Sequence, residues 1–430
     1  MAETPVREPL ATFDSAWTII ARTHWDTSYN GVNWGAVRDS LRPQAARSAS
    51  TGELRAVLER MVGTLRQSHF SIIPRELSDV VAPEVSAARQ RQASDRNGSI
   101  GATLRLLDGT MVVTAVREDG SAKRAGVQSG WTVSAVDGCS LAPALSRLSV
   151  NPNADARRTS LAAYTLANEA LAGAVGDTVR VAFTVGTGAR RVVAIEREEE
   201  PGTVTKFGNL PPLKAWLEFE RVRAGARAIG IIRFNIWMPV LSPQFDVAMD
   251  SLRDSDAIVL DLRGNFGGVG GMSMGIAGHF LDSMITIGTM RQRGLTARFV
   301  ANPRRVDTRA RAVEPFAGPL ALVVDELSIS TTEIFAGGLQ AIGRARVFGT
   351  QTSGQALPAV TERLPNGDIL YHAIADFLSP AGTPLEGDGV RPDVLMPPSK
   401  RALLEGRDAA LDAAVRWAAE TAGSRRKTAP

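Results

Sequence analysis

The chain has 430 residues, of which 44% are hydrophobic and 22% charged, and its net charge is +4. This length exceeds what one hydrophobic core usually supports, so we expect two or three domains. The basic residues are spread along the chain rather than gathered in one patch, which argues against nucleic-acid binding. No apolar run approaches the ~20 residues that span a bilayer, so the sequence predicts no integral membrane segment.

The sequence shows no pattern typical of a metal or disulfide site. Cys139 is the single cysteine, which excludes an internal disulfide and any multi-cysteine metal site. The histidines His24, His69, His279 and His372 are scattered, without the close spacing of metal ligands. We therefore expect no metal and no other cofactor.

The first 78 residues are predicted to form an N-terminal helical domain (1–78). Apolar residues recur at three- and four-residue steps over residues 12 to 76, as in Phe13, Trp17 and Ile20, and Pro74 is expected to end this region. The following stretch, Asp79–Asn97, is polar and resembles a connector.

A second domain, 95–199, is predicted from short β runs broken by glycine. Strands are expected over 99–106, 111–116, 131–136, 178–185 and 190–197, with a short helix within 120–130, flanked by glycine turns, and a further helix around 161–171. The segments Gly120–Gly130 and Ala135–Gly138 resemble a PDZ domain. The resemblance implies that the loop Ile100-Gly101-Ala102 binds the carboxylate of an extended peptide. The alternative is a small β-domain that serves only as a spacer.

After a Pro-containing linker, predicted over 200 to 225, strands and helices alternate. The expected strands are 228–234, 257–262, 320–324, 345–348, 369–377 and 390–395, and the expected helices are 242–252, 272–280 and 332–341. This alternation favours an α/β core with parallel strands over residues 215–400. A closing helix is predicted in the final segment, 401–430.

Two turns at strand ends could carry chemistry. In Ala257-Ile-Val-Leu-Asp-Leu-Arg-Gly-Asn-Phe-Gly-Gly268 a buried strand ends in a glycine-rich turn, whose backbone N–H groups suit an oxyanion. The spacing of its glycines matches neither a P-loop nor a dinucleotide-binding motif. In Leu320–Leu339 a strand is followed by Ser328-Ile-Ser330-Thr-Thr-Glu333, which begins a helix. Ser330 there could be an exposed nucleophile, or only the N-cap of a capping box with Glu333.

Together, these turns resemble in order and context the C-terminal processing peptidase and tricorn protease family. The stretches Val347–Gly354 and Leu378–Asp393 resemble two further motifs of that family. The resemblance covers nearly the whole chain and implies a ClpP/crotonase-like α/β core with an inserted PDZ-like β-domain. It implies a serine peptidase in which Ser330 is the nucleophile.

The resemblance also implies which group activates the serine. One branch of the family uses a lysine at the position of Gln355, and an amide cannot accept the proton. The tricorn-like branch uses a histidine after a helical segment, which corresponds to His69, with Ser68 linking it to Glu386. Lys214 remains the rival base and Asp388 the rival carboxylate.

The oxyanion hole is expected to use the backbone N–H of Thr331 and that of either Gly267 or Gly268. The predicted substrate is an extended or unfolded polypeptide cleaved through an acyl-enzyme. Two alternatives stay open, a non-catalytic lipid-, ligand- or peptide-binding protein on this scaffold and an acyl-CoA enzyme. A homo-oligomer and a periplasmic or secreted location are further expectations; a cytoplasmic location is the alternative, and the N-terminus Met1-Ala-Glu-Thr-Pro shows no signal peptide.

Overall fold

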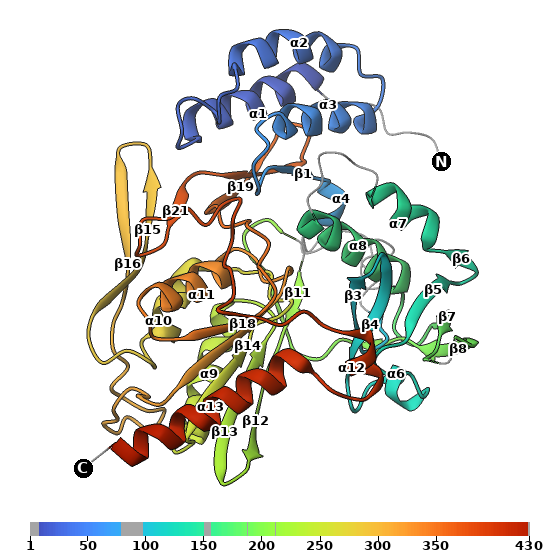
Figure 1. Cartoon of the computed structure of the whole chain (residues 1–430). Coiled ribbons are helices and arrows are strands. Elements are labelled where there is room, and N and C mark those ends of the chain that lie inside the picture. Colours follow the sequence, from blue (N-terminus) through green and yellow to red (C-terminus); the bar gives the residue numbers. More distant parts are fainter. Residues whose placement is uncertain (1–7, 79–97, 150–155, 187, 211, 429–430) are drawn as a thin grey trace.

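The computed structural model describes residues 8–78, 98–149, 156–186, 188–210 and 212–428, and Figure 1 shows how their elements are arranged. The predicted connector Asp79–Asn97 lies outside these residues. The described elements form four hydrophobic clusters, one for the N-terminal helices, one for the β-unit that follows, and one on each face of a central sheet. The fold is mixed α/β, as expected.

Three helices form the N-terminal layer at the top of Figure 1. They are α1 (Pro9–Thr23), α2 (Trp34–Ala46) and α3 (Thr51–Gly63). Their apolar faces bury Phe13, Ile20 and Leu58 completely. Asn33 and Ser50 cap α2 and α3 by accepting backbone N–H groups.

The predicted helical region ends earlier than residue 76. Ser71–Ile73 forms a strand, β1, which pairs antiparallel with β20 (Ile369–Ala373) of the C-terminal part. The helix prediction was wrong here because a long-range strand pairing, invisible in local periodicity, determines the backbone. The short helix α4 (Arg75–Ser78) follows Pro74. This pairing joins the N-terminal helices to the rest of the molecule.

Residues 98–199 form a separate β-unit, here called the β3–β8 unit. Its strands are ordered β3-β4-β5-β7-β8, with β6 beside β5 and β2 paired with β9. Its cluster buries Trp131 and Phe183, whose rings lie edge to face. Its elements are β2 (Gly98–Ser99), β3 (Ala102–Leu107), β4 (Thr110–Val116), α6 (Ser121–Arg124), β5 (Thr132–Val136), β6 (Cys139–Ser140), α7 (Ala142–Ser149), α8 (Ala156–Leu171), β7 (Thr178–Thr184), β8 (Arg190–Glu196) and β9 (Glu198–Glu199).

The central sheet has the strand order β12-β13-β14-β17-β18-β22. The expected parallel pairing is confirmed for β13 through β22, while β12 is antiparallel to β13. The predicted linker over 200 to 225 is therefore wrong in several places, because it contains two three-residue strands and the charged, solvent-facing strand β12, all of which give little hydrophobic signal. The strands are β10 (Thr203–Thr205) and β11 (Leu213–Ala215), which pair with each other, then β12 (Leu217–Ala224), β13 (Arg227–Phe234), β14 (Ala257–Asp261), β17 (Leu320–Val324), β18 (Arg346–Gly349) and β22 (Val394–Leu395).

Helices cover both faces of this sheet. α9 (Ser242–Leu252), α10 (Gly270–Ala277) and α11 (Thr331–Ala341) contribute to the cluster on one face. α13 (Ala409–Thr428), red in Figure 1, packs its alanines on the other face, and α12 (Lys400–Leu404) precedes it. The predicted C-terminal helix is thus two helices. Because helices cover both faces, β14 and β17 are buried along their whole length.

A hairpin that the sequence analysis did not predict projects beside α10 and α11. It consists of β15 (Ile285–Gln292) and β16 (Leu295–Ala301), and β21 (Asp376–Leu378) pairs with β15. β19 (Ala359–Arg363) pairs with β20. The hairpin is yellow in Figure 1 and runs toward the N-terminal helices, where Arg293 donates to the carbonyl oxygen of His24 at 2.6 Å.

Candidate active site

The two predicted turns meet at one edge of the central sheet. β14 and β17 are parallel neighbours, so the turns after their carboxyl ends lie side by side. The N–H of Ile329 donates to the carbonyl oxygen of Asn265 at 3.0 Å, and the Thr331 hydroxyl donates to that of Gly268 at 2.9 Å. The glycine-rich turn and the serine turn therefore form one joined structure.

Ser330 occupies the N-cap position of α11 with unusual backbone angles. Its φ of 59° and ψ of −118° are uncommon for a residue with a side chain. Its N–H donates to the carbonyl oxygen of Gln355 at 2.9 Å and to the Glu333 carboxylate at 3.1 Å. The capping box is present, and Ser330 also lines a large cavity. Ser330 is therefore both the N-cap of α11 and a residue that a substrate could reach.

Glu333 is completely buried directly behind Ser330. One carboxylate oxygen accepts from the Thr352 hydroxyl (2.6 Å) and the Gly354 N–H (2.7 Å). The other accepts from the N–H groups of Ser330 and Gln355, the latter at 3.0 Å. Burial raises the pKa of Glu333 to about 7, while these four donors favour the ionised form. Sequence reasoning assigned Glu333 only to a capping box and missed this role.

The glycine turn leaves one backbone N–H open beside the serine. The Gly267 N–H donates to the side-chain oxygen of Asn265 at 3.1 Å. Among the described residues, no acceptor is found for the N–H of Gly268 or Thr331, and both residues line the cavity. Gly267 has a φ of 90°, and a Cβ there would lie 2.6 Å from that of Ser330, so glycine is required for this close approach.

Ser68, His69 and Glu386 form a hydrogen-bonded chain. The Ser68 hydroxyl lies 2.7 Å from Nδ1 of His69 and donates to the Glu386 carboxylate at 2.8 Å. Glu386 also accepts the Ser68 N–H at 2.8 Å and the Ala356 N–H at 3.1 Å. Burial raises the pKa of Glu386, and the bonds from Ser68 counteract this. Residues 318 positions apart in sequence are thus joined directly.

The His69 ring is held on the cavity wall. It lies 5.5 Å from the Tyr371 ring, and Tyr371 is placed opposite Ser71 by the β1–β20 pairing. Burial lowers the pKa of His69 to about 4, so the imidazole is neutral at pH 7. His69 and Ser330 line the same cavity, and across the described residues no hydrogen bond joins the two.

The rival residues have other partners. The Lys214 ammonium lines the same cavity and pairs with Glu199 at 2.6 Å. Asp388 has a largely exposed side chain that pairs with Arg391 at 3.6 Å. The Gln355 amide donates to the Ser353 hydroxyl at 2.6 Å. Of the two candidate carboxylates, the one in contact with Ser68 is Glu386.

The cavity has a volume of about 1670 Å³ and extends from Ser330 to the β3–β8 unit. Ile100, Gly101 and Ala102 line its far part. Ile100 and Gly101 each have a backbone group that is already hydrogen-bonded within the β3–β8 unit. The Ile100 carbonyl oxygen accepts the Ala122 N–H at 2.9 Å, and the Gly101 N–H donates to the Ser99 hydroxyl at 3.2 Å. The predicted peptide loop and the predicted nucleophile thus open into one space.

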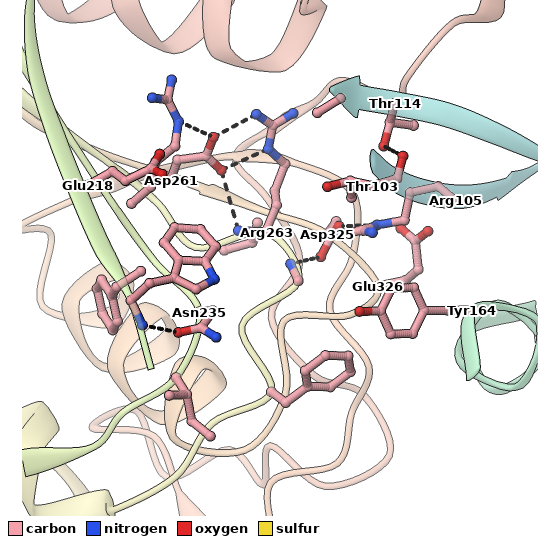
Figure 2. Close-up of a pocket in the computed structure, with 18 of the residues that line it drawn as sticks. Thr103, Arg105, Thr114, Tyr164, Glu218, Asn235, Asp261, Arg263, Asp325 and Glu326 are labelled. Atoms are coloured by element: carbon pink, nitrogen blue, oxygen red, sulfur yellow. Dashed lines mark hydrogen bonds and ion pairs between the residues drawn. The ribbon is translucent and has the colours of Figure 1, made fainter. Parts of the chain in front are cut away.

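A buried ion pair attaches the β3–β8 unit to the serine turn. Arg105 of β3 donates to Asp325 at 2.7 Å, and both side chains are under 10% exposed. Figure 2 shows this contact beside Glu326 and the Tyr164 ring, over which the guanidinium lies at 5.6 Å. The second carboxylate oxygen of Asp325 accepts the Gly264 N–H of the glycine turn at 2.8 Å. Nothing local in the sequence indicated this contact between residues 220 positions apart.

The remaining histidines and the cysteine do not line this cavity. His24, His279 and His372 are buried and bonded to Gln67, Asp246 and Glu362, and Cys139 is exposed. In the part of the chain that the structure describes, no three acidic, histidine or cysteine side chains come together as a metal site would need. Within the same residues, no helix combines the length and apolar character needed to cross a bilayer.

Comparison with known proteins defines the class to which the chain belongs, a serine peptidase, which is a hydrolase. Residues 228–396 match the model for peptidase family S41, and residues 5–63 match the tricorn protease C1 domain. Each match covers less than half of the chain, and together they cover two separate parts of it. The first match spans the central sheet from β13 to β22, without β12, and the second includes the three N-terminal helices.

Curated relatives agree with this assignment. The chain is 26% identical to the chloroplastic carboxyl-terminal-processing peptidase 2 of Arabidopsis thaliana over 90% of its own length and 68% of the relative's. It is 26% identical to the putative tricorn protease homolog 2 of Streptomyces coelicolor over 97% of its own length, but it spans only 32% of that relative.

Solved structures show the same fold at lower identity. The photosystem II D1 C-terminal processing protease aligns with a TM-score of 0.59 at 21% identity, covering 94% of this chain and 99% of that one. Mature CPAF aligns with a TM-score of 0.62 at 13% identity, covering 97% of this chain and 98% of that one. These alignments support the mixed α/β fold.

Proposed function

We propose that the chain hydrolyses peptide bonds of extended or unfolded polypeptides through an acyl-enzyme on Ser330, with His69 as the general base. The observation that carries this proposal is the Glu386–Ser68–His69 chain on the wall of the cavity that Ser330 also lines. The carboxylate and Ser68 orient the imidazole through Nδ1, which leaves Nε2 for the serine proton.

In the proposed first step, the Ser330 hydroxyl oxygen attacks the substrate carbonyl carbon while its proton moves to Nε2 of His69. The carbonyl oxygen becomes negative and accepts the N–H groups of Thr331 and Gly268. We favour Gly268 over Gly267 because the latter's N–H is already bonded to Asn265. The step requires Ser330 to come within hydrogen-bond reach of His69, a contact that commonly tightens only when substrate binds.

In the proposed second step, the imidazolium donates its proton to the leaving amine and the C–N bond breaks. A water molecule then attacks the acyl-enzyme, giving its proton to His69, and the free carboxyl end is released as Ser330 regains its proton. The neutral imidazole that burial maintains can accept the proton in both half-reactions.

The domain limits belong to the proposal as well. We assign 1–78 to the N-terminal helical domain, 95–199 to a PDZ-like domain, 215–400 to a ClpP/crotonase-like catalytic core and 401–430 to a C-terminal helix and tail. The single cavity that joins Ser330 to Ile100–Ala102 supports a role of the PDZ-like loop in holding an extended substrate. Export from the cytoplasm and homo-oligomerisation remain predictions.

The test is the Ser330→Ala variant of the full chain. We expect it to lose hydrolysis of an unfolded protein such as casein and labelling by a fluorophosphonate, because both need the serine oxygen. Ser328→Ala serves as the comparison at a neighbouring, fully buried hydroxyl. Casein hydrolysis that survives in Ser330→Ala would contradict the proposal and favour a non-catalytic binding protein or a different nucleophile.

A further inference from the structure

The cavity wall beside His69 is formed by the antiparallel strands β19 and β20. Ala359 and Tyr371 of these strands line the cavity. In the ladder, Tyr371 lies opposite Thr361, two residues after Ala359, so the side chains of Ala359 and Tyr371 project from the same face of the sheet. His372 projects from the other face and is completely buried. The Tyr371 side chain therefore belongs to the face that opens into the cavity.

The Tyr371 ring is held close to the proposed base by the strands on both sides of it. β1 pairs with β20 on one edge and β19 pairs with it on the other, so Tyr371 lies in the central strand of a three-stranded sheet. Its ring centroid lies 5.5 Å from that of His69, with the two ring planes tilted by 53°. Tyr371 and Ser330 line the same cavity. A substrate that reaches both Ser330 and His69 therefore passes Tyr371.

The Tyr371 hydroxyl is open to the cavity and lacks a protein partner. Tyr371 is partly exposed, its oxygen is not fully enclosed, and no hydrogen bond to it is found among the described residues. The other two tyrosines of the chain differ, because the Tyr29 hydroxyl donates to the carbonyl oxygen of Ala21 at 3.1 Å and the Tyr164 hydroxyl bonds to Asn168. A phenol in a largely buried position normally has a partner. For Tyr371 that partner must be something that fills the cavity.

The chemistry of this wall favours a main-chain partner over a charged side chain. Burial raises the pKa of Tyr371, so its phenol keeps its proton and can donate a hydrogen bond. Within the part of the chain that the structure describes, β19 and β20 contribute no charged side chain to the cavity wall. Every peptide group of a polypeptide offers a carbonyl oxygen as an acceptor. A neutral donor without a charged neighbour suits that oxygen.

From this arrangement we infer that Tyr371 is a substrate-binding residue, whose hydroxyl donates to a main-chain carbonyl oxygen of the polypeptide beside the scissile bond. The inference rests on the proposed function. The scissile peptide group must lie between Ser330 and His69, and consecutive residues of an extended chain are about 3.3 Å apart. A neighbouring peptide group therefore comes within reach of the Tyr371 hydroxyl. Because this contact uses the main chain, it aligns extended polypeptides of different sequence.

The first test is Tyr371→Phe in the full chain, with a panel of unstructured peptides that differ in the side chains around the cleaved bond. We expect kcat/KM to fall by about 3- to 10-fold for every peptide, as the loss of one uncharged hydrogen bond predicts. Fluorophosphonate labelling should keep the wild-type rate, because the probe has no peptide group and needs only Ser330 and its base. A parallel loss of cleavage and labelling would contradict the inference, since it would show that Tyr371 supports His69 and not the substrate.

The second test locates the acceptor on the substrate. In a series made from one peptide, each carbonyl group that flanks the cleaved bond is replaced in turn by a methylene group. One of these replacements should lower kcat/KM of the wild type by about 3- to 10-fold more than that of Tyr371→Phe, because the variant has already lost this hydrogen bond. Equal losses in the two proteins at every position would overturn the inference.

Tyr29→Phe is the matched control. It removes the same hydroxyl from a tyrosine that does not line the cavity, so both kcat/KM and labelling should match the wild type. A Tyr371→Phe protein that cleaves every peptide at the wild-type rate, while Ser330→Ala is inactive, would overturn this inference alone. Failure of the proposed function would appear instead as cleavage by Ser330→Ala.

Discussion

At the residue scale, the structure gives His69 the properties of a base that stays neutral. Its Nδ1 is bonded to Ser68, and burial lowers its pKa to about 4 from an ordinary value of 6.5. Between pH 6.5 and 4, the unfolded imidazole would bind a proton that the native one does not. Folding stability therefore falls as the pH drops through this window, and is unaffected by His69 above it.

We expect the His69 ring to titrate with a midpoint near pH 4. NMR of ring-labelled histidine in the full chain measures this directly, with His69→Ala assigning the signal among the histidines. The substitution should also reduce the loss of stability between pH 6.5 and 4. A His69 midpoint near 6.5 would contradict the lowered pKa of this ring.

Some of the candidate site residues could be predicted from the sequence, and others could not. Ser68, His69, Glu386 and Ser330 were predicted from motifs that resemble those of a known family, and the structure brings the first three into one hydrogen-bonded chain. Glu333 was recognised only as a cap, since its bonds to Thr352 and Gly354 cross 19 and 21 residues. The choice between Gly267 and Gly268 depended on one hydrogen bond to Asn265, which no spacing reveals.

At the scale of elements, Glu333 fixes the start of α11 to the loop 352–355. All four of its hydrogen-bond partners are donors, and three of them are backbone N–H groups that cannot reverse direction. We expect Glu333→Gln to lower kcat by about 10- to 100-fold. The NH₂ group of the glutamine would face hydrogen-bond donors, and the lost hydrogen bonds, at a cost of about 1–3 kcal/mol, would displace the serine turn. KM should change little.

The control for that change is Glu326→Gln in the neighbouring turn, where the carboxylate accepts the Thr350 hydroxyl at 3.0 Å. Steady-state kinetics and the melting temperature of both variants separate positioning from general destabilisation. A Glu333→Gln protein with the kcat of the wild type would show that the four donors do not position Ser330.

Some secondary-structure elements were predicted from the sequence and others were not. The buried strands β14 and β17 were predicted correctly because both faces are apolar and glycine or serine turns end them. β1, β12 and the β15–β16 hairpin were missed or misassigned. Each is short, charged or partly exposed, and each is stabilised by pairing with a distant strand or by packing on a neighbouring helix.

At the scale of the whole molecule, the proposed base and nucleophile come from distant parts of the chain. His69 follows the N-terminal helices, which β1 attaches to β20, while Ser330 begins α11 on the central sheet. The β3–β8 unit attaches separately to the same turns through Arg105 and Asp325. Reactivity of the serine should therefore depend on the packing of several units, and not only on residues 228–396, which match the S41 model.

The most direct measurement is the rate of fluorophosphonate labelling in His69→Ala and Lys214→Ala at pH 7. We expect His69→Ala to label at least 100-fold more slowly than the wild type, because the serine proton has no acceptor, and Lys214→Ala to label at the wild-type rate. Rapid labelling of His69→Ala together with slow labelling of Lys214→Ala would contradict the assignment of His69 as the base.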